Sequence, residues 1–260
     1  MKVKKKKNKK NSLVILGIVV IVLLAVAIVV FAFNASKNQK NDTEYYQPES
    51  RYEKAAATII EGTVTKGWIK VQGTNVDYPV VEEHEIISGV KEYAWISSEY
   101  YDGENRMAIY GHNMQNVSYK PLIADPEHKR FEQLLSFVYE DFAKENLYIQ
   151  YSHDDVDELY KIYAIGFYDF EDDYGYSYDY NMQAESLTNY INDVKTSSIY
   201  NYNVDVNNTD ELLSLITCTR FFGNSELTTF KIDARKVRDG EKIEKYSVQK
   251  STNYDILGLE

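Results

Sequence analysis

Short hydrophobic runs separated by polar stretches recur along residues 62–240. Several runs there are rich in β-branched and aromatic residues, and turn-prone residues bound most of them. The runs are residues 67–72, 76–82, 106–112, 146–152, 158–170, 211–219 and 227–237. This pattern predicts strands and a strongly β domain with a barrel or sandwich core.

Three other stretches have the pattern or the composition of helices. Residues 128–140 carry apolar side chains at 131, 134, 135 and 138, which is the spacing of one helix face. Residues 181–200 repeat that spacing at 187, 190, 191 and 194. Residues 51–61, "RYEKAAATIIE", are rich in helix formers. The expected fold class is therefore mostly β, with helices inserted.

Residues 13–33 form an apolar run without charge, preceded by seven lysines in the first ten residues. A helix of this length spans about 31 Å, roughly one hydrocarbon core. A cleavable signal peptide is the alternative, but its apolar core is shorter, about 7–15 residues, and "FNASK" is a poor cleavage site. We therefore expect an uncleaved signal-anchor that crosses the cell membrane once, with the lysines in the cytoplasm and the rest outside.

Composition divides the chain into five parts. They are a cytoplasmic basic segment (1–12), the transmembrane signal-anchor (13–33), a polar linker (34–50), one globular domain (51–245) and a C-terminal tail (246–260). The whole chain has a net charge of −11, and without the leading lysines it has 22 basic against 40 acidic residues, a net of −18. Such a field repels nucleic acid and anionic lipid, so nucleic acid is not an expected partner.

Cys218 is the only cysteine in 260 residues. In an exported protein such a thiol is buried and inert, paired between chains, or used chemically. A catalytic thiol needs a base, and the chain has four histidines. His84 lies in a polar turn, His128 at the start of a predicted helix and His153 in a strand-end turn, and solvated side chains are expected for all three. His112 instead follows the predicted strand "MAIYG", so it and Cys218 stand at strand ends that can meet at one rim of a barrel.

The stretches "AIYGHNM" (108–114) and "LLSLITCT" (212–219) resemble the sortases, membrane-anchored transpeptidases of Gram-positive bacteria, and within them class B. The sortase signature is Thr-Leu-x-Thr-Cys, and here its first position is Ser214. "WIKVQGTNVDYPVV" (68–81) adds support, and the resemblance spans roughly residues 50–240. It implies a sortase-type closed β-barrel with inserted helices, preceded by one N-terminal transmembrane helix, with 51–245 as the catalytic domain.

The resemblance also implies a reaction. Cys218 would attack a carbonyl in a C-terminal sorting motif of an exported protein and form a thioester. An amine of a cell-wall precursor or a pilin would then resolve it, with His112 as general acid and base. The backbone N–H of Thr219 is the implied oxyanion donor. No cofactor is implied, and the scattered histidines show no metal-ligand spacing.

The family places an arginine at the start of the strand after the cysteine. Aligning "FKIDARKV" with that strand puts Thr229 in the arginine's position. Arg235 lies six residues further on, about 20 Å along a strand, and is too distant to replace it. Arg220, two residues after Cys218, is the remaining candidate for stabilising the transition state.

Two other functions fit parts of the sequence. One is an extracellular cysteine endopeptidase on a chymotrypsin-like double barrel, although "ITCTR" lacks the glycines expected around that nucleophile. The other is a non-catalytic membrane-tethered binding domain with a buried thiol. Thiol reactivity distinguishes them, because a structural cysteine resists alkylation in the native state.

Overall fold

The computed structural model describes residues 45–82, 94–96, 103–113, 131–169, 180–223 and 228–259. Tyr46–Glu260 form one compact unit, distinct from Met1–Tyr45. Across the described ranges, no helix is long and apolar enough to cross a bilayer. The predicted spanning segment, residues 13–33, lies outside the described residues.

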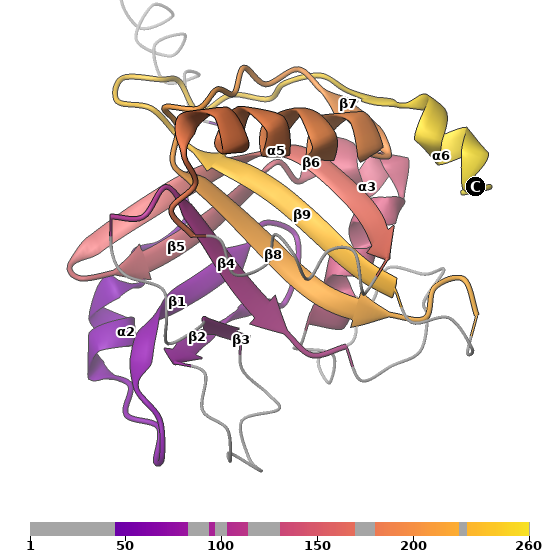
Figure 1. Ribbon diagram of the computed structural model, residues 1–260. Coiled ribbons are helices and arrows are strands. Elements are labelled where there is room, and N and C mark those ends of the chain that lie inside the picture. The colour runs from indigo at the N-terminus through magenta and orange to yellow at the C-terminus, as the bar shows by residue number, and fades with distance from the viewer. Residues whose placement is uncertain are drawn as a thin grey trace, which may run out of the picture. The chain divides into compact units, whose positions relative to one another are not determined.

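Eight strands close into a barrel in the order β1-β2-β3-β4-β8-β9-β6-β5, since β1 pairs with both β2 and β5 (Figure 1). They are β1 (Thr65–Val71), β2 (Asp77–Glu82), β3 (Ala94–Ile96), β4 (Arg106–Gly111), β5 (Tyr148–His153), β6 (Val156–Asp169), β8 (Leu212–Thr219) and β9 (Thr228–Lys236). The pairs β2–β3 and β4–β8 are parallel. The predicted closed barrel is confirmed, and the sandwich alternative is wrong.

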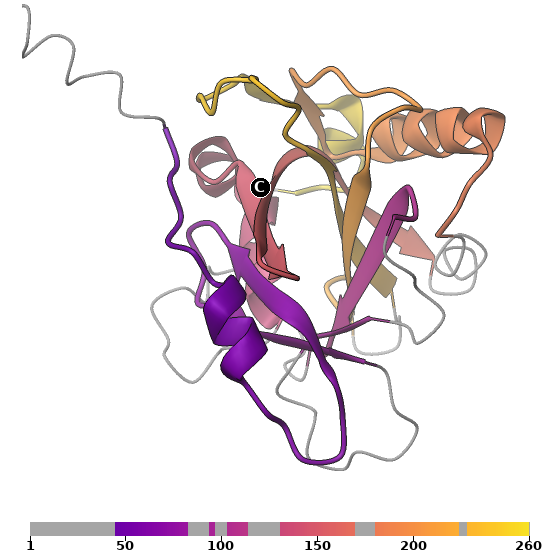
Figure 2. The same cartoon turned by 90° about the vertical axis from the view of Figure 1, so that its left-hand side faces the viewer.

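Helices and a small sheet lie outside the ring of strands. They are α2 (Tyr52–Ala57), the 3₁₀ helix η2 (Phe131–Val138), α3 (Glu140–Glu145), α5 (Ala184–Ser197), α6 (Thr252–Ile256) and the two-stranded sheet of β7 (Tyr200–Tyr202) and β10 (Val248–Lys250). Figures 1 and 2 show α5 on the side of β6 and β9, and α2 on the side of β1. Strand β8 is buried at every position except Cys218.

The helix predicted over residues 128–140 differs from the structure. Its described part is η2, and α3 follows after a break at Tyr139, where the backbone is extended (φ −81°, ψ 123°). All eight residues of η2 are buried, so the apolar positions that indicated an α-helix instead serve a short 3₁₀ segment. Strands β3, β7 and β10 were not predicted, since three residues are too few to show alternation.

Both ends of the compact unit pack against it. Arg51 donates from Nε and Nη2 to the two Asp77 carboxylate oxygens, each at 3.1 Å, and the Tyr46 ring stacks on Tyr148. The last residues of the predicted linker, 46–50, therefore lie on the strands. Residues 246–260, predicted as a tail, contain β10 and α6, and Tyr254 is 2% exposed.

One face of β4, β8 and β9 organises the site. Cross-strand partners share a face, and α5 covers the face that bears Ser214 and Asp233, which we call the outer face. Its rows follow from the register and are Ala108–Ser214–Asp233, Tyr110–Ile216–Lys231 and, at the open end, Cys218–Thr229.

Candidate active site

His112 and Cys218 lie at the same end of two neighbouring strands. Strands β4 and β8 run parallel, with Tyr110 opposite Ile216. Cys218 lies two residues further along β8, and His112 follows the last residue of β4, so both stand at the same end of the two strands, and both are exposed. The structure thus puts the two residues that the sequence singled out at the same end of neighbouring strands.

A buried hydrogen bond joins the two strands just before these residues. Thr217 Oγ1 donates to the Gly111 carbonyl at 2.7 Å, and Thr217 is 2% exposed. Packing explains the glycine at position 111, because a Cβ there would lie 2.4 Å from the Phe131 ring. The ends of β4 and β8 are therefore fixed to each other one residue before His112 and Cys218.

We expect Thr217→Val to lower turnover roughly ten- to a hundredfold, because small misplacements of reacting groups are costly. Losing the buried hydrogen bond should also lower the free energy of unfolding by about 1–3 kcal/mol. Steady-state kinetics and urea denaturation measure the two effects. Thr217→Ser keeps the hydroxyl and should retain most of the turnover; equal losses in both variants would contradict a role for the hydrogen bond.

Two opposing influences act on the Cys218 thiol. Partial burial by the surrounding protein raises the pKa of Cys218, although its side chain reaches solvent, while the positive charge of Arg220 lowers it. The net shift is upward, so the thiol is mostly protonated at neutral pH. A catalytic role for this thiol would therefore need a neighbouring base, and His112, at the same end of β4, is the candidate.

The arginine expected after the cysteine is absent from the position opposite it. Thr229 pairs directly with Cys218 and is 4% exposed. Arg235 pairs with Leu212 at the other end of β8, and its guanidinium binds Glu241. Arg220 immediately follows β8, is half-buried, and is the cation that acts on the thiol. Thr219 pairs with Thr228, and its side chain is buried.

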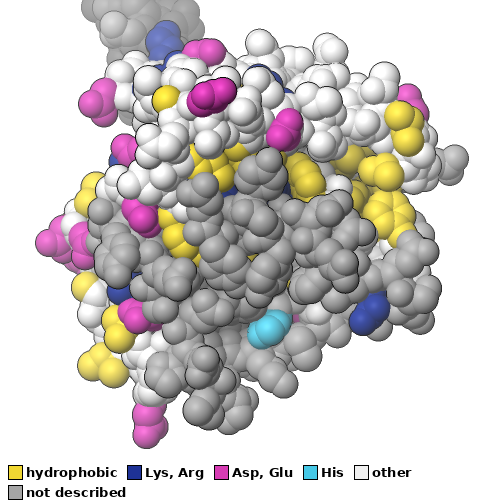
Figure 3. Space-filling model, viewed as in Figure 1, with side chains coloured by type: hydrophobic (Ala, Val, Ile, Leu, Met, Phe, Trp, Pro, Cys, Tyr) yellow, Lys and Arg dark blue, Asp and Glu magenta, His cyan; other side chains and the backbone are white. Residues whose placement is uncertain are grey.

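The loop that follows the cysteine strand lines a pocket of about 260 Å³. Its lining includes Phe221 and Phe222 of this loop, Val138 at the end of η2, and Leu257 and Leu259 near the C-terminus. Both phenylalanine rings pack on Phe167 of β6. In Figure 3, hydrophobic side chains gather on the side where α6 lies. The C-terminal segment thus supports the loop next to Cys218.

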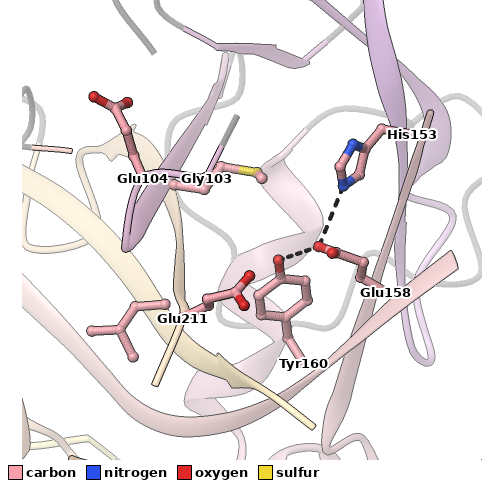
Figure 4. A pocket seen from close by; sticks show the side chains of 8 residues that line it. Gly103, Glu104, His153, Glu158, Tyr160 and Glu211 are labelled. Carbon is pink, nitrogen blue, oxygen red and sulfur yellow. Dashed lines mark hydrogen bonds and ion pairs between the residues drawn. The ribbon is translucent and has the colours of Figure 1, made fainter. Parts of the chain in front are cut away.

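His153 is not the solvated turn residue that its sequence suggested. Its side chain is 15% exposed, and its Nε2 lies 3.4 Å from a Glu158 carboxylate oxygen. Both residues line a small pocket with Tyr160 and Glu211, at the end of β8 opposite Cys218 (Figure 4). His84 and His128 lie outside the described residues. Within the described ranges, no cluster of His, Cys, Asp and Glu could hold a metal ion.

Glu158 is the electrostatic centre of this second pocket. Burial alone would raise its pKa, but hydrogen bonds from His153, Lys236 and Tyr160 outweigh burial and lower the pKa of Glu158 to about 2. The same contact with Glu158 raises the pKa of His153. The ion pair is therefore complete only between these two pKa values.

Glu158→Gln should lower the free energy of unfolding by roughly 2–3 kcal/mol at pH 5, because a depressed carboxyl pKa stabilises the fold above its unfolded value. The difference from wild type should shrink as the pH falls from about 4.5 toward 2. The share of this stabilisation that comes from the charged His153 should be lost as the pH rises through the raised pKa of His153. Denaturation curves across pH test this. Glu211→Gln is the control, since the Glu211 side chain is 57% exposed and, of the three groups that contact Glu158, binds only Lys236. An equally large loss of stability in Glu211→Gln would contradict the central role of Glu158 in this pocket.

No protein-family model matches the chain. Its fold is that of the class B sortases, and it resembles them in sequence as well. The chain is 24% identical to sortase B of Listeria monocytogenes over 208 residues, which covers 70% of this chain and 79% of the relative.

Solved structures give the same result for the fold. The crystal structure of Clostridium perfringens sortase B matches with a TM-score of 0.56 at 22% identity, covering 67% of this chain and 94% of that one. A sortase B–substrate complex from Staphylococcus aureus matches with a TM-score of 0.53 at 14% identity, covering 68% and 81% of the two chains.

Proposed function

We propose that this chain is a membrane-anchored cysteine transpeptidase of the class B sortase type. The observation that carries the proposal is an exposed thiol, Cys218, near the end of β8 at which the parallel neighbouring strand β4 leads into His112. The sequence and fold likeness to sortases gives that pair its expected chemistry.

In the proposed first step, His112 takes the Cys218 proton and the sulfur attacks a peptide carbonyl of the sorting motif. The C–N bond breaks, His112 gives its proton to the leaving amine, and a thioester remains. Arg220 and the Thr219 N–H would stabilise the oxyanion. In the second step an amine loses its proton to His112 and attacks the thioester. A new amide forms, and the thiol is released.

The proposed setting is the outer surface of the cell membrane. Residues 13–33 would anchor the chain, with 1–12 in the cytoplasm and the catalytic domain outside. Clients would be exported proteins with a C-terminal sorting motif, and the acceptor an amine of the cell wall or a pilin. The net charge of −18 without the leading lysines favours a cationic amine nucleophile.

The test is intact-protein mass spectrometry of the full chain in detergent with a panel of sorting-motif peptides, with and without an amine acceptor. A peptide-sized adduct that is absent in Cys218→Ala and cleared by the amine is the expected result. Hydrolysed peptide with no amine-dependent product would favour an endopeptidase. No adduct, together with a thiol that resists alkylation, would favour a tethered binding domain and overturn the proposal.

A further inference from the structure

A buried polar cluster lies on the outer face, four residues before Cys218 along β8. Ser214 Oγ donates to Asp233 Oδ1 at 2.7 Å, and Tyr190 OH donates to the same oxygen at 2.5 Å. The two hydroxyl oxygens are 3.0 Å apart. None of the three residues is more than 1% exposed. We call Ser214, Asp233 and Tyr190 the hydroxyl–carboxylate cluster.

The cluster joins β8 to β9 and α5, and one further contact connects it to β4. Ser214 belongs to β8, Asp233 to β9 and Tyr190 to α5. The Arg106 guanidinium of β4 lies 4.6 Å from the centre of the Tyr190 ring and is fully buried. Strand β4 precedes His112 and strand β8 contains Cys218. A shift at the cluster would therefore change the position of Cys218 relative to His112.

Register connects the cluster to the thiol. Ser214 pairs with Asp233 just as Cys218 pairs with Thr229, four residues along each strand, or about 13 Å. Between the two rows lies the row Tyr110–Ile216–Lys231, in which Ile216 packs with Ala108 and Tyr180. The Lys231 ammonium is buried there and lies 5.1 Å from the centre of the Tyr190 ring. Close-packed layers transmit displacement rather than absorb it, so a cluster that fixes one row also fixes the next.

We infer that Ser214, Asp233 and Tyr190 are positioning residues, which hold β8 and β9 in register under α5 so that Cys218 stays aligned with His112. A buried carboxylate that accepts two hydroxyl donors specifies one arrangement of these three elements. Slipping β8 against β9 by two residues would keep the faces but would bring Ile216, not Cys218, opposite Thr229. It would also leave the Asp233 oxygen without the Ser214 donor. This inference rests on the proposed function.

Ser214→Ala in the full chain is the test, with Ser214→Thr as the variant that restores the hydroxyl. We expect Ser214→Ala to lower kcat about tenfold, with KM within twofold of wild type. We expect Ser214→Thr to recover most of the loss. Should Ser214→Ala fail to fold, Tyr190→Phe removes a single hydroxyl of the cluster and should give the same pattern.

The second readout is the pH profile of Cys218 alkylation by iodoacetamide, which requires no enzyme activity. A loosened β8 end should be less buried, so the midpoint of the profile should move toward lower pH in Ser214→Ala and stay at the wild-type position in Ser214→Thr. If wild type alkylates normally but transfers no peptide, the proposed function fails while this profile still tests the cluster.

Tyr200→Phe is the matched control for stability. Its hydroxyl donates to the Val138 carbonyl in a buried hydrogen bond outside the cluster. This variant should lower the melting temperature without changing kcat or the alkylation profile. The inference would be overturned if Tyr200→Phe also lowered kcat and shifted the alkylation profile. It would equally be overturned if a folded Ser214→Ala kept the kcat and the alkylation profile of wild type.

Discussion

Replacing His112 with alanine is expected to lower peptide turnover by about 10² to 10⁴-fold. The raised pKa of Cys218 leaves the thiol mostly protonated at neutral pH, so the reaction needs a base to form the nucleophile and an acid to release the amine. Under the proposed function His112, which follows β4 at the same end as Cys218, does both. Single-turnover measurement of thioester formation by quenched mass spectrometry gives the rate of the first step directly.

His153→Ala is the matched control for that variant. It removes a histidine that pairs with Glu158 at the opposite end of β8, and should leave turnover within about twofold when measured well below its melting temperature. Alkylation of Cys218 should still proceed in His112→Ala, since it needs only the thiolate fraction that the thiol reaches by itself. Turnover above a tenth of wild type in His112→Ala would show that another group supplies the proton transfers.

The sequence predicts the local parts of this site well. Strand-end positions for His112 and Cys218 follow from the β-rich runs before them and from the glycine before the histidine, and the structure places both there. The adjacency of β4 and β8 is different, because their residues are 106 positions apart and nothing in either run states which strand it pairs with. The chemistry of a thiol and a base suggested that the two strand ends can meet, and the resemblance to a known family supported that hypothesis.

The second pocket was missed for a related reason. His153 begins a two-residue turn in which Asp154 and Asp155 have positive φ of 41° and 64°, and the returning strand brings Glu158 beside it. The sequence "HDDVDE" looks solvated because it is polar throughout. A tight hairpin at Asp-Asp would have been the signal, since Asp tolerates left-handed backbone and primed turns join antiparallel strands.

The buried charges of the outer layer are the least predictable part. Arg235 was considered only as a distant substitute for the missing family arginine, and in the structure it is 2% exposed and bound to Glu241. Glu241 stands in a polar, turn-rich stretch, "RDGEK", which by itself indicates a solvated loop. Partner choice between distant charges depends on the closed barrel, which no local pattern encodes.

Glu241 is therefore the subject of the second large expected effect. It accepts from both Arg235 nitrogens, at 2.5 and 2.7 Å, and from Lys161 Nζ at 2.7 Å, and the Arg235 hydrogen bonds hold the pKa of Glu241 well below its ordinary value. Glu241→Ala leaves the Arg235 guanidinium buried without its carboxylate partner. Because an uncompensated buried charge is costly, we expect the free energy of unfolding to fall by about 3–5 kcal/mol in guanidinium or urea titrations.

Glu145→Ala is the control for that loss. It breaks the ion pair between Glu145 and Lys245, whose side chains are 64% and 47% exposed respectively. An exposed ion pair contributes at most about 1 kcal/mol to the free energy of unfolding. The sign of the pH dependence provides a further check. A depressed carboxyl pKa stabilises the fold above the unfolded value, so the difference between wild type and Glu241→Ala should be constant near neutrality and narrow as the pH falls below about 4.5. A loss below 1 kcal/mol, or one that grows in acid, would mean that Arg235 finds another partner and that this pair does not hold β9 in place.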